Sequence, residues 1–205
     1  ACAYEGQTNA LDDCANFLSG MDFGLGTAFS ASVDLDNGIG VAFGYEGQDD
    51  WTGLGTDEAL DAYAFNLSYI KDNYGLSYTF GDGETLETSA FNAFYTPDLD
   101  RFPSISFGLE WTHDEDPSLT DDNDDFSHYF IGAQFDNVGN GSLGAAVGSK
   151  TPYAEDTDAE TMWEAYYAYN YADGITITPV VYVKENAAVN TDDETGIILK
   201  TTFEF

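Results

Sequence analysis

The chain has 205 residues with 38 acidic and only 5 basic side chains, so its formal net charge is −33 at neutral pH. Such a charge excludes nucleic-acid binding, which requires a basic surface. It suits attraction of cations, binding of divalent ions or adaptation to high salt. Aromatic residues make up 16% of the chain and glycine occurs 21 times, as is typical of strands and tight turns. No apolar run reaches the roughly 18 residues of a transmembrane helix.

Residues 1–20 form an N-terminal segment that precedes the regular part of the sequence. It contains both cysteines, Cys2 and Cys14. In an exported protein a disulfide between them would close a short loop, and two separate thiols are the alternative. The spacing of the two cysteines fits no zinc-binding pattern.

From Met21 onward the sequence alternates with a period of two, and this predicts strands rather than helices, whose period is 3.6. In 21–35 the odd positions are mostly large and apolar, and the even positions are small or polar. Similar alternation recurs in ten further segments: 39–46, 63–69, 74–80, 91–95, 105–111, 129–135, 143–147, 163–171, 175–183 and 197–205. We therefore expect about eleven strands, each near the length of about 9–11 residues that crosses a bilayer.

The connections between these strands alternate in length. Short turns are predicted at 36–38, 71–73, 136–141 and 173–174, with an intermediate connection at 96–103. Longer connections are predicted at 47–60, 82–87, 113–125, 151–161 and 186–195, and most of the acidic residues fall in these loops. Short turns at one end and long loops at the other are typical of outer-membrane barrels.

Large apolar residues occupy one face of the predicted strands, whereas Gly, Ser, Ala, Thr and Asn dominate the other. In a soluble barrel the large residues would point inward. Here the second face would make a thin polar wall, and aromatic residues gather towards the strand ends, as at the two bilayer interfaces. We therefore predict an all-β, antiparallel up-and-down barrel of the outer-membrane porin type over residues 21–205. A soluble barrel or sandwich is the alternative.

The number of strands affects how such a barrel can close. If the last strand ends in the periplasm, counting back places 36–38 in the periplasm and residues 1–20 on the external side. Bacterial single-chain barrels have an even number of strands. An odd count of eleven therefore indicates a twelfth strand drawn from 1–20, or a larger barrel of which this chain is one part. We expect a homo-oligomer or a missing barrel half as partner.

Two stretches near the end, Glu160–Tyr169 (ETMWEAYYAY) and Asp173–Pro179 (DGITITP), resemble the C-terminal region of cyanobacterial outer-membrane porins. These porins form the carbohydrate-selective-porin-like family, and the ending Lys200–Phe205 (KTTFEF) is similar too. The resemblance is specific over about the last 50 residues. It implies passive uptake of small solutes, including inorganic ions and iron, and a terminal Phe205 that acts in an assembly signal. The family's S-layer-homology domain and coiled coil are not found in this sequence, so its anchoring to peptidoglycan is not carried over.

The odd or even position of a residue in its strand predicts the face on which it lies, and so predicts which charged residues line a pore. If odd positions face lipid, the pore-lining candidates are Lys150, Lys184, Lys200, Glu110, Glu164 and His128. Opposed charges across a pore filter polar solutes by their transverse field. Internal salt bridges that support the wall are the equal alternative.

The acidic loops are candidate calcium sites because clustered carboxylates supply hard oxygen ligands. The candidate ligands are Asp121, Asp122, Asp124 and Asp125, although no EF-hand is present. A solvated or salt-tolerant loop is the simpler interpretation. No other cofactor is expected.

An enzyme is not expected, because neither histidine, His113 or His128, lies near a recognisable nucleophile motif. The leading hypothesis is a cation-leaning porin for small hydrophilic solutes in a bacterial outer membrane. The rival is an extracellular or surface protein that assembles with itself into a fibre, tube or layer. An adhesive barrel without an open lumen is a third reading.

Overall fold

The computed structural model describes residues 27–47, 61–83, 86–99, 101–114, 125–149, 153–154, 158–186 and 192–204. In these ranges the regular structure consists of strands. The first six are β1 (Thr27–Asp34), β2 (Ile39–Gly47), β3 (Asp61–Lys71), β4 (Tyr74–Asp82), β5 (Leu86–Tyr95) and β6 (Ser104–Asp114). The others are β7 (Asp125–Phe135), β8 (Gly141–Ser149), β9 (Tyr153–Ala154), β10 (Thr161–Ala172), β11 (Ile175–Lys184) and β12 (Glu194–Phe203). No described helix is long and apolar enough to cross a membrane.

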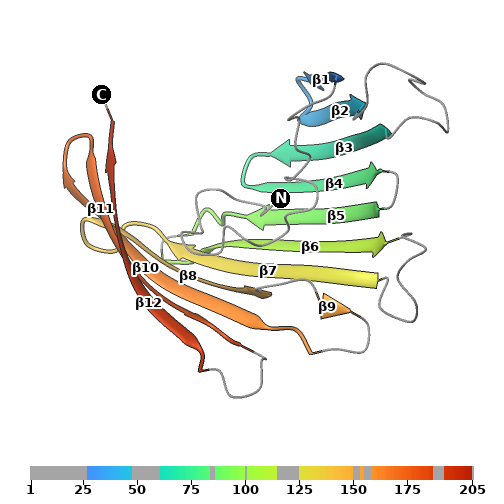
Figure 1. Ribbon diagram of the computed structural model, residues 1–205. Coiled ribbons are helices and arrows are strands. Elements are labelled where there is room, and N and C mark those ends of the chain that lie inside the picture. Colours follow the sequence, from blue (N-terminus) through green and yellow to red (C-terminus); the bar gives the residue numbers. More distant parts are fainter. Residues whose placement is uncertain are drawn as a thin grey trace.

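All the strands belong to one antiparallel sheet in which neighbours in sequence are neighbours in space (Figure 1). The order is β1-β2-β3-β4-β5-β6-β7-β8-β10-β11-β12, and the short β9 pairs with the N-terminal end of β7. This meander confirms the predicted all-β, up-and-down architecture. The prediction had placed β9 inside a loop over 151–161, because two residues are too few for alternation to be visible.

The short turns lie where the sequence predicts them. The β1–β2 turn contains Gly38 at φ 87°, and the β10–β11 turn contains Gly174 at φ 71°, a left-handed backbone that glycine adopts without strain. A side chain at Gly38 is also excluded by space, since its Cβ would lie 2.1 Å from the carbonyl oxygen of Ile70. These turns set the pairing registers β1–β2 and β10–β11, the latter with one irregularity between Asn170 and Ala172.

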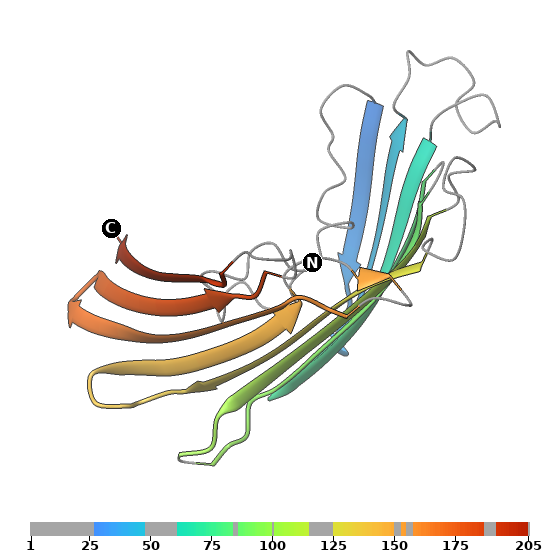
Figure 2. The same cartoon turned by 60° about the horizontal axis from the view of Figure 1, so that its bottom comes forward.

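The sheet is strongly curved but open, so it forms a trough rather than a closed barrel (Figure 2). Its two edges are β1 and β12, which do not pair with each other in the described part of the chain. Ten successive antiparallel pairings connect them, so β1 and β12 run in the same direction. Direct closure would therefore require a parallel pair in an otherwise antiparallel sheet, and this accounts for the difference from the predicted barrel.

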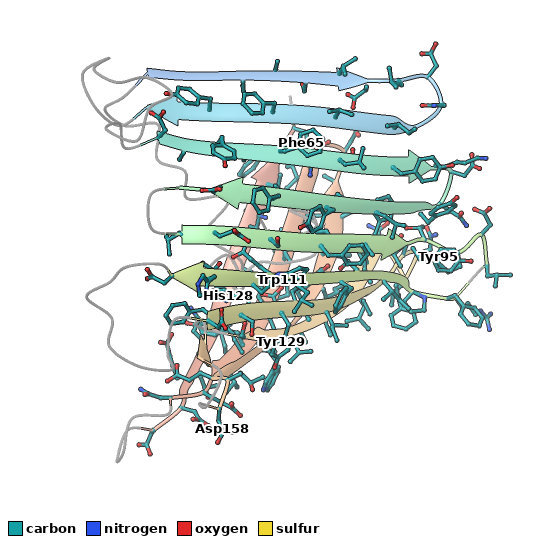
Figure 3. The ribbon with its side chains drawn as sticks, turned by 90° about the vertical axis from the view of Figure 1, so that its right-hand side faces the viewer. Phe65, Tyr95, Trp111, His128, Tyr129 and Asp158 are labelled. Carbon is teal, nitrogen blue, oxygen red and sulfur yellow. The ribbon has the colours of Figure 1, made fainter. Side chains whose placement is uncertain are left out.

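Alternation gives the sheet two distinct faces. The outer face carries the large apolar side chains, and it can be followed across β3, β6 and β7 through Phe65, Trp111 and Tyr129 in Figure 3. Many of these side chains are exposed, for example Leu67 at 47% and Ile131 at 46%. A soluble fold would bury such residues, so this face indicates contact with something other than water.

The inner face carries mostly small and polar residues, and it also has an apolar part. There Phe130, Ala146 and Met162 form a buried apolar cluster on β7, β8 and β10. The curvature of the sheet brings side chains on the concave side together, so large residues can pack there as they would in a core.

Candidate functional site: the inner wall

The inner wall gathers the buried ionisable residues of the described sheet. Pairing of β6 with β7 places Glu110 directly opposite His128, and pairing of β10 with β11 places Glu164 opposite Tyr182. The exposed fractions are 1% for both glutamates and 3% for His128. Carboxylates are rarely buried to this extent without a specific role or partner. These residues therefore define the candidate site on the concave face.

Hydrogen bonds fix the side chains around His128. The Nδ1 atom of His128 lies 3.3 Å from Oγ of Ser149, and the same hydroxyl accepts the backbone N–H of Tyr129 at 3.1 Å. On neighbouring strands, the hydroxyls of Thr88 and Thr112 are 2.9 Å apart. Side-chain hydrogen bonds on this part of the wall thus join β7 to β8 and β5 to β6.

A second hydrogen-bonded group lies on β7 and β10. The Tyr166 hydroxyl donates to Oε1 of Gln134 at 2.7 Å, across the Gly144 position of β8. A Cβ on Gly144 would lie 2.3 Å from Cζ of Tyr166, so the ring covers the glycine. The same arrangement recurs twice, with Phe94 over Gly75 and Tyr182 over Gly196. An aromatic ring over a glycine on the next strand protects the bare backbone and fixes the register.

The lysines of the wall lie towards its C-terminal edge. Lys184 on β11 is opposite Glu194 of β12, and its Nζ lies 5.5 Å from the centroid of the Tyr182 ring. The Tyr182 hydroxyl in turn donates to Oε1 of Glu194 at 2.8 Å. Lys200 is opposite Thr178 and is exposed. This edge of the inner wall therefore carries both acidic and basic side chains, next to the part of the wall that carries Glu110 and Glu164.

The structure places five of the six predicted pore-lining residues on the same face: Glu110, His128, Glu164, Lys184 and Lys200. Glu110 lies directly opposite His128. Lys184 lies two residues along β11 from Tyr182, which is opposite Glu164. Lys150 lies outside the described residues. That these residues line a water-filled pore remains a prediction.

The sequence reasoning missed Gln134, Ser149 and Glu194, and it missed the three aromatic-glycine pairs. Their roles depend on which residue faces which across two strands. Alternation alone gives the face of a residue but not its partner. The strands of the Tyr182–Gly196 and Phe94–Gly75 pairs are joined by longer connections, so no tight turn in the sequence indicated their register.

Of the four predicted calcium ligands, the structure describes only Asp125. Asp121, Asp122 and Asp124 lie outside the described residues, as do Cys2, Cys14 and Phe205. Asp125 is described, and its Oδ1 lies 2.9 Å from Nδ1 of the partly exposed His113. Among the described residues no group of three or more His, Cys, Asp or Glu is arranged to hold a metal ion. A calcium site in the loop therefore stays a prediction.

Comparison with known proteins identifies the fold. No protein-family model and no curated protein sequence matches the chain. Among solved structures, a triply substituted mutant of Rh. blastica porin is similar with a TM-score of 0.60 and 14% identity, over 91% of this chain and 58% of the porin. A second triple mutant of that porin gives a TM-score of 0.58 and 14% identity, over 87% and 55%. The fold is therefore porin-like, and the chain spans between half and three-fifths of the porins that it matches.

Proposed function

We propose that this chain forms part of the wall of a porin that passes small hydrophilic solutes or ions through a bacterial outer membrane. The observation that carries the proposal is the two-sided sheet. Its outer face exposes large apolar residues along strands of mostly 8 to 12 residues, and its inner face carries charged and hydroxyl side chains. Strands of this length with this alternation suit a bilayer on one side and water on the other.

We further propose that the pore prefers cations. The inner wall carries Glu110, Glu164 and Glu194, against Lys184 and Lys200 on the described strands. The net charge of −33 adds an acidic mouth through the loops. Acidic surfaces at a pore entrance raise the local concentration of cations.

The likeness of 160–179 and 200–205 to cyanobacterial porins supports assignment to the carbohydrate-selective-porin-like family, with passive uptake of solutes rather than catalysis. In this proposal the partners are the lipid bilayer and further strands, supplied by a second copy of the chain or by the missing part of a larger barrel.

Solute flux in proteoliposomes tests the proposal. Vesicles containing the purified chain should swell in isotonic solutions of small sugars or salts and should not swell with large dextrans, because a barrel excludes solutes above its width. Vesicles in which the chain is inserted but no solute enters would contradict a porin.

A second candidate is a self-assembling extracellular or surface protein, and the open edges of the sheet favour it. Edges such as β1 and β12 present unpaired backbone groups that template association. Detergent-free electron microscopy distinguishes the two functions. Ordered fibres, tubes or layers would support the structural role, and detergent-dependent particles would support the porin.

A further inference from the structure

The outer face is recessed at the loop end of β5, β6 and β7. A hollow of about 480 Å³ lies around Trp111 and reaches Ser89, Ser127 and the charged residues Glu87, His113 and Asp125. Strand pairing places Ser89 and Ser127 directly on either side of Trp111. Two small polar residues leave the sides of the indole ring uncovered in a face that otherwise carries large apolar side chains.

A second tryptophan on the same face has different neighbours. Trp163 is 45% exposed and Trp111 is 44% exposed, but the neighbours of Trp163 are Val147 and Val183. The two tryptophans thus share exposure and face and differ in the size and polarity of the side chains beside the ring.

Acidic residues form the rim of the hollow. One row across β4, β5, β6 and β7 contains Asp82, Glu87, His113 and Asp125 in register. His113 contacts Asp125 at 2.9 Å, and Asp82 accepts the Tyr63 hydroxyl at 2.7 Å. Like charges directly opposite, as at Asp82 and Glu87, destabilise a sheet. A positive group seated beside them would relieve this repulsion.

We propose that this hollow binds a bilayer lipid whose headgroup carries an ammonium group. An exposed indole ring with carboxylates nearby recognises ammonium groups through cation–π attraction and charge. The apolar outer face directly below would contact the rest of the lipid, so the ligand must be cationic at one end and apolar at the other. A bare metal ion fits less well, because the described residues offer no cluster of three ligands. The inference rests on the proposed function, since it requires the outer face to meet lipid.

The test uses two full-length proteins that differ in which tryptophan remains. Trp51→Phe with Trp163→Phe leaves Trp111, and Trp51→Phe with Trp111→Phe leaves Trp163 as the matched control. Both are reconstituted in phosphatidylglycerol vesicles with a small fraction of phosphatidylcholine that is spin-labelled on its ammonium group. We expect quenching of Trp111 to exceed that of Trp163 by about 2- to 5-fold. Glu87→Gln with Asp125→Asn should remove the excess.

Three results would overturn the proposal or its basis, and they are distinguishable. Equal quenching of both tryptophans by the headgroup label, with strong quenching by a label on the acyl chain, would reject the lipid site and leave the porin in place. An excess that survives Glu87→Gln with Asp125→Asn would show that these carboxylates do not recognise the ammonium group and would reject the lipid site. Absence of quenching by the acyl-chain label at both positions would instead reject the membrane location.

Discussion

At the residue scale, the aromatic rings that cover glycines are the clearest link between sequence and register. Tyr166 lies over Gly144 and is held there by its hydrogen bond to Gln134. The ring shields backbone that a glycine leaves bare, and the hydrogen bond keeps the ring from turning away. One small residue and one large residue on adjacent strands therefore specify a pairing that neither specifies alone.

Replacing Gly144 by alanine tests this arrangement. The new Cβ would lie 2.3 Å from Tyr166, so the ring must move and its hydrogen bond must break. We expect a loss of about 1–3 kcal/mol in the free energy of unfolding, the usual cost of overpacking. Gly44→Ala is the control, since nothing lies within 4 Å of its Cβ, and it should be neutral or stabilising by about 0.5–1 kcal/mol. Urea titration in detergent, followed by tryptophan fluorescence, measures both. Equal midpoints for the two variants would contradict the pairing.

The glutamates of the inner wall give a functional test. Glu110→Gln and Glu164→Gln each remove a negative charge from the concave face, where both residues are 1% exposed. We expect each substitution to lower the ratio of cation to anion permeability, because the local attraction for cations falls. Reversal potentials in a salt gradient measure this ratio. Asp98→Asn, an exposed position in the β5–β6 connection, is the control and should leave the ratio near that of the unsubstituted protein.

The sequence predicted the face of each wall residue but not its contacts. Glu110, His128, Glu164, Lys184 and Lys200 share a face because a period of two fixes parity along a strand. The contact of His128 with Ser149 was not predictable, because it depends on how far β8 slides along β7. The β7–β8 connection sets that offset, and its five residues, 136–140, are more than the two-residue turn whose register a sequence specifies.

At the element scale, alternation predicted the strands that are long enough to repeat it. All eleven strands of the main path were expected, and the differences lie at their ends, as at β5, which begins at Leu86 rather than at 91. The residues Leu86–Ala90 break the apolar pattern, because Thr88 and Ala90 are buried on the inner face and Ser89 lies beside Trp111. Because residues 86–90 do not alternate between large apolar and small polar side chains, the pattern could not predict that they belong to the strand.

A charge on the outer face tests whether that face meets lipid. Leu67 lies mid-strand on β3 and is 47% exposed, so Leu67→Arg would be nearly neutral in water. In a bilayer the same change should cost about 2–4 kcal/mol. Ser77→Arg on β4 is the control, since Ser77 lines a hollow of about 180 Å³ on the inner face.

Unfolding in urea from phospholipid vesicles compares the two arginine variants. A midpoint for Leu67→Arg that equals that of the unsubstituted chain would show that the apolar face does not contact hydrocarbon. In that event the outer face must be covered by protein.

At the scale of the whole molecule, the eleven strands on the main path of the described sheet decide how a pore can be completed. Because β1 and β12 run in the same direction, only an odd number of further strands gives an antiparallel pair at both edges. Two copies joined edge to edge would instead have two parallel seams. The sequence predicted the eleven strands of this path, because eleven segments alternate between apolar and small or polar residues. It could not predict the curvature, which arises from twist and packing summed over the entire sheet.

We expect a conducting assembly to contain more than this single chain. Native mass spectrometry in mild detergent should detect assemblies of at least two polypeptides, and single copies should not form a folded species that resists SDS, because their two edges stay unpaired. A monomer that conducts and resists SDS would contradict this expectation. It would show that the chain closes its own barrel, either through a parallel pair of β1 and β12 or through a further strand from residues 1–20.

Single-channel conductance in planar bilayers under a salt gradient distinguishes a porin from a structural protein. We expect stepwise conductance with a reversal potential that favours cations, because strands with one apolar face and one acidic, hydroxyl-rich face would enclose a water-filled path across the bilayer. A protein that associates with the bilayer but gives no conductance steps at any applied voltage would contradict the porin and leave the self-assembling structural role in its place.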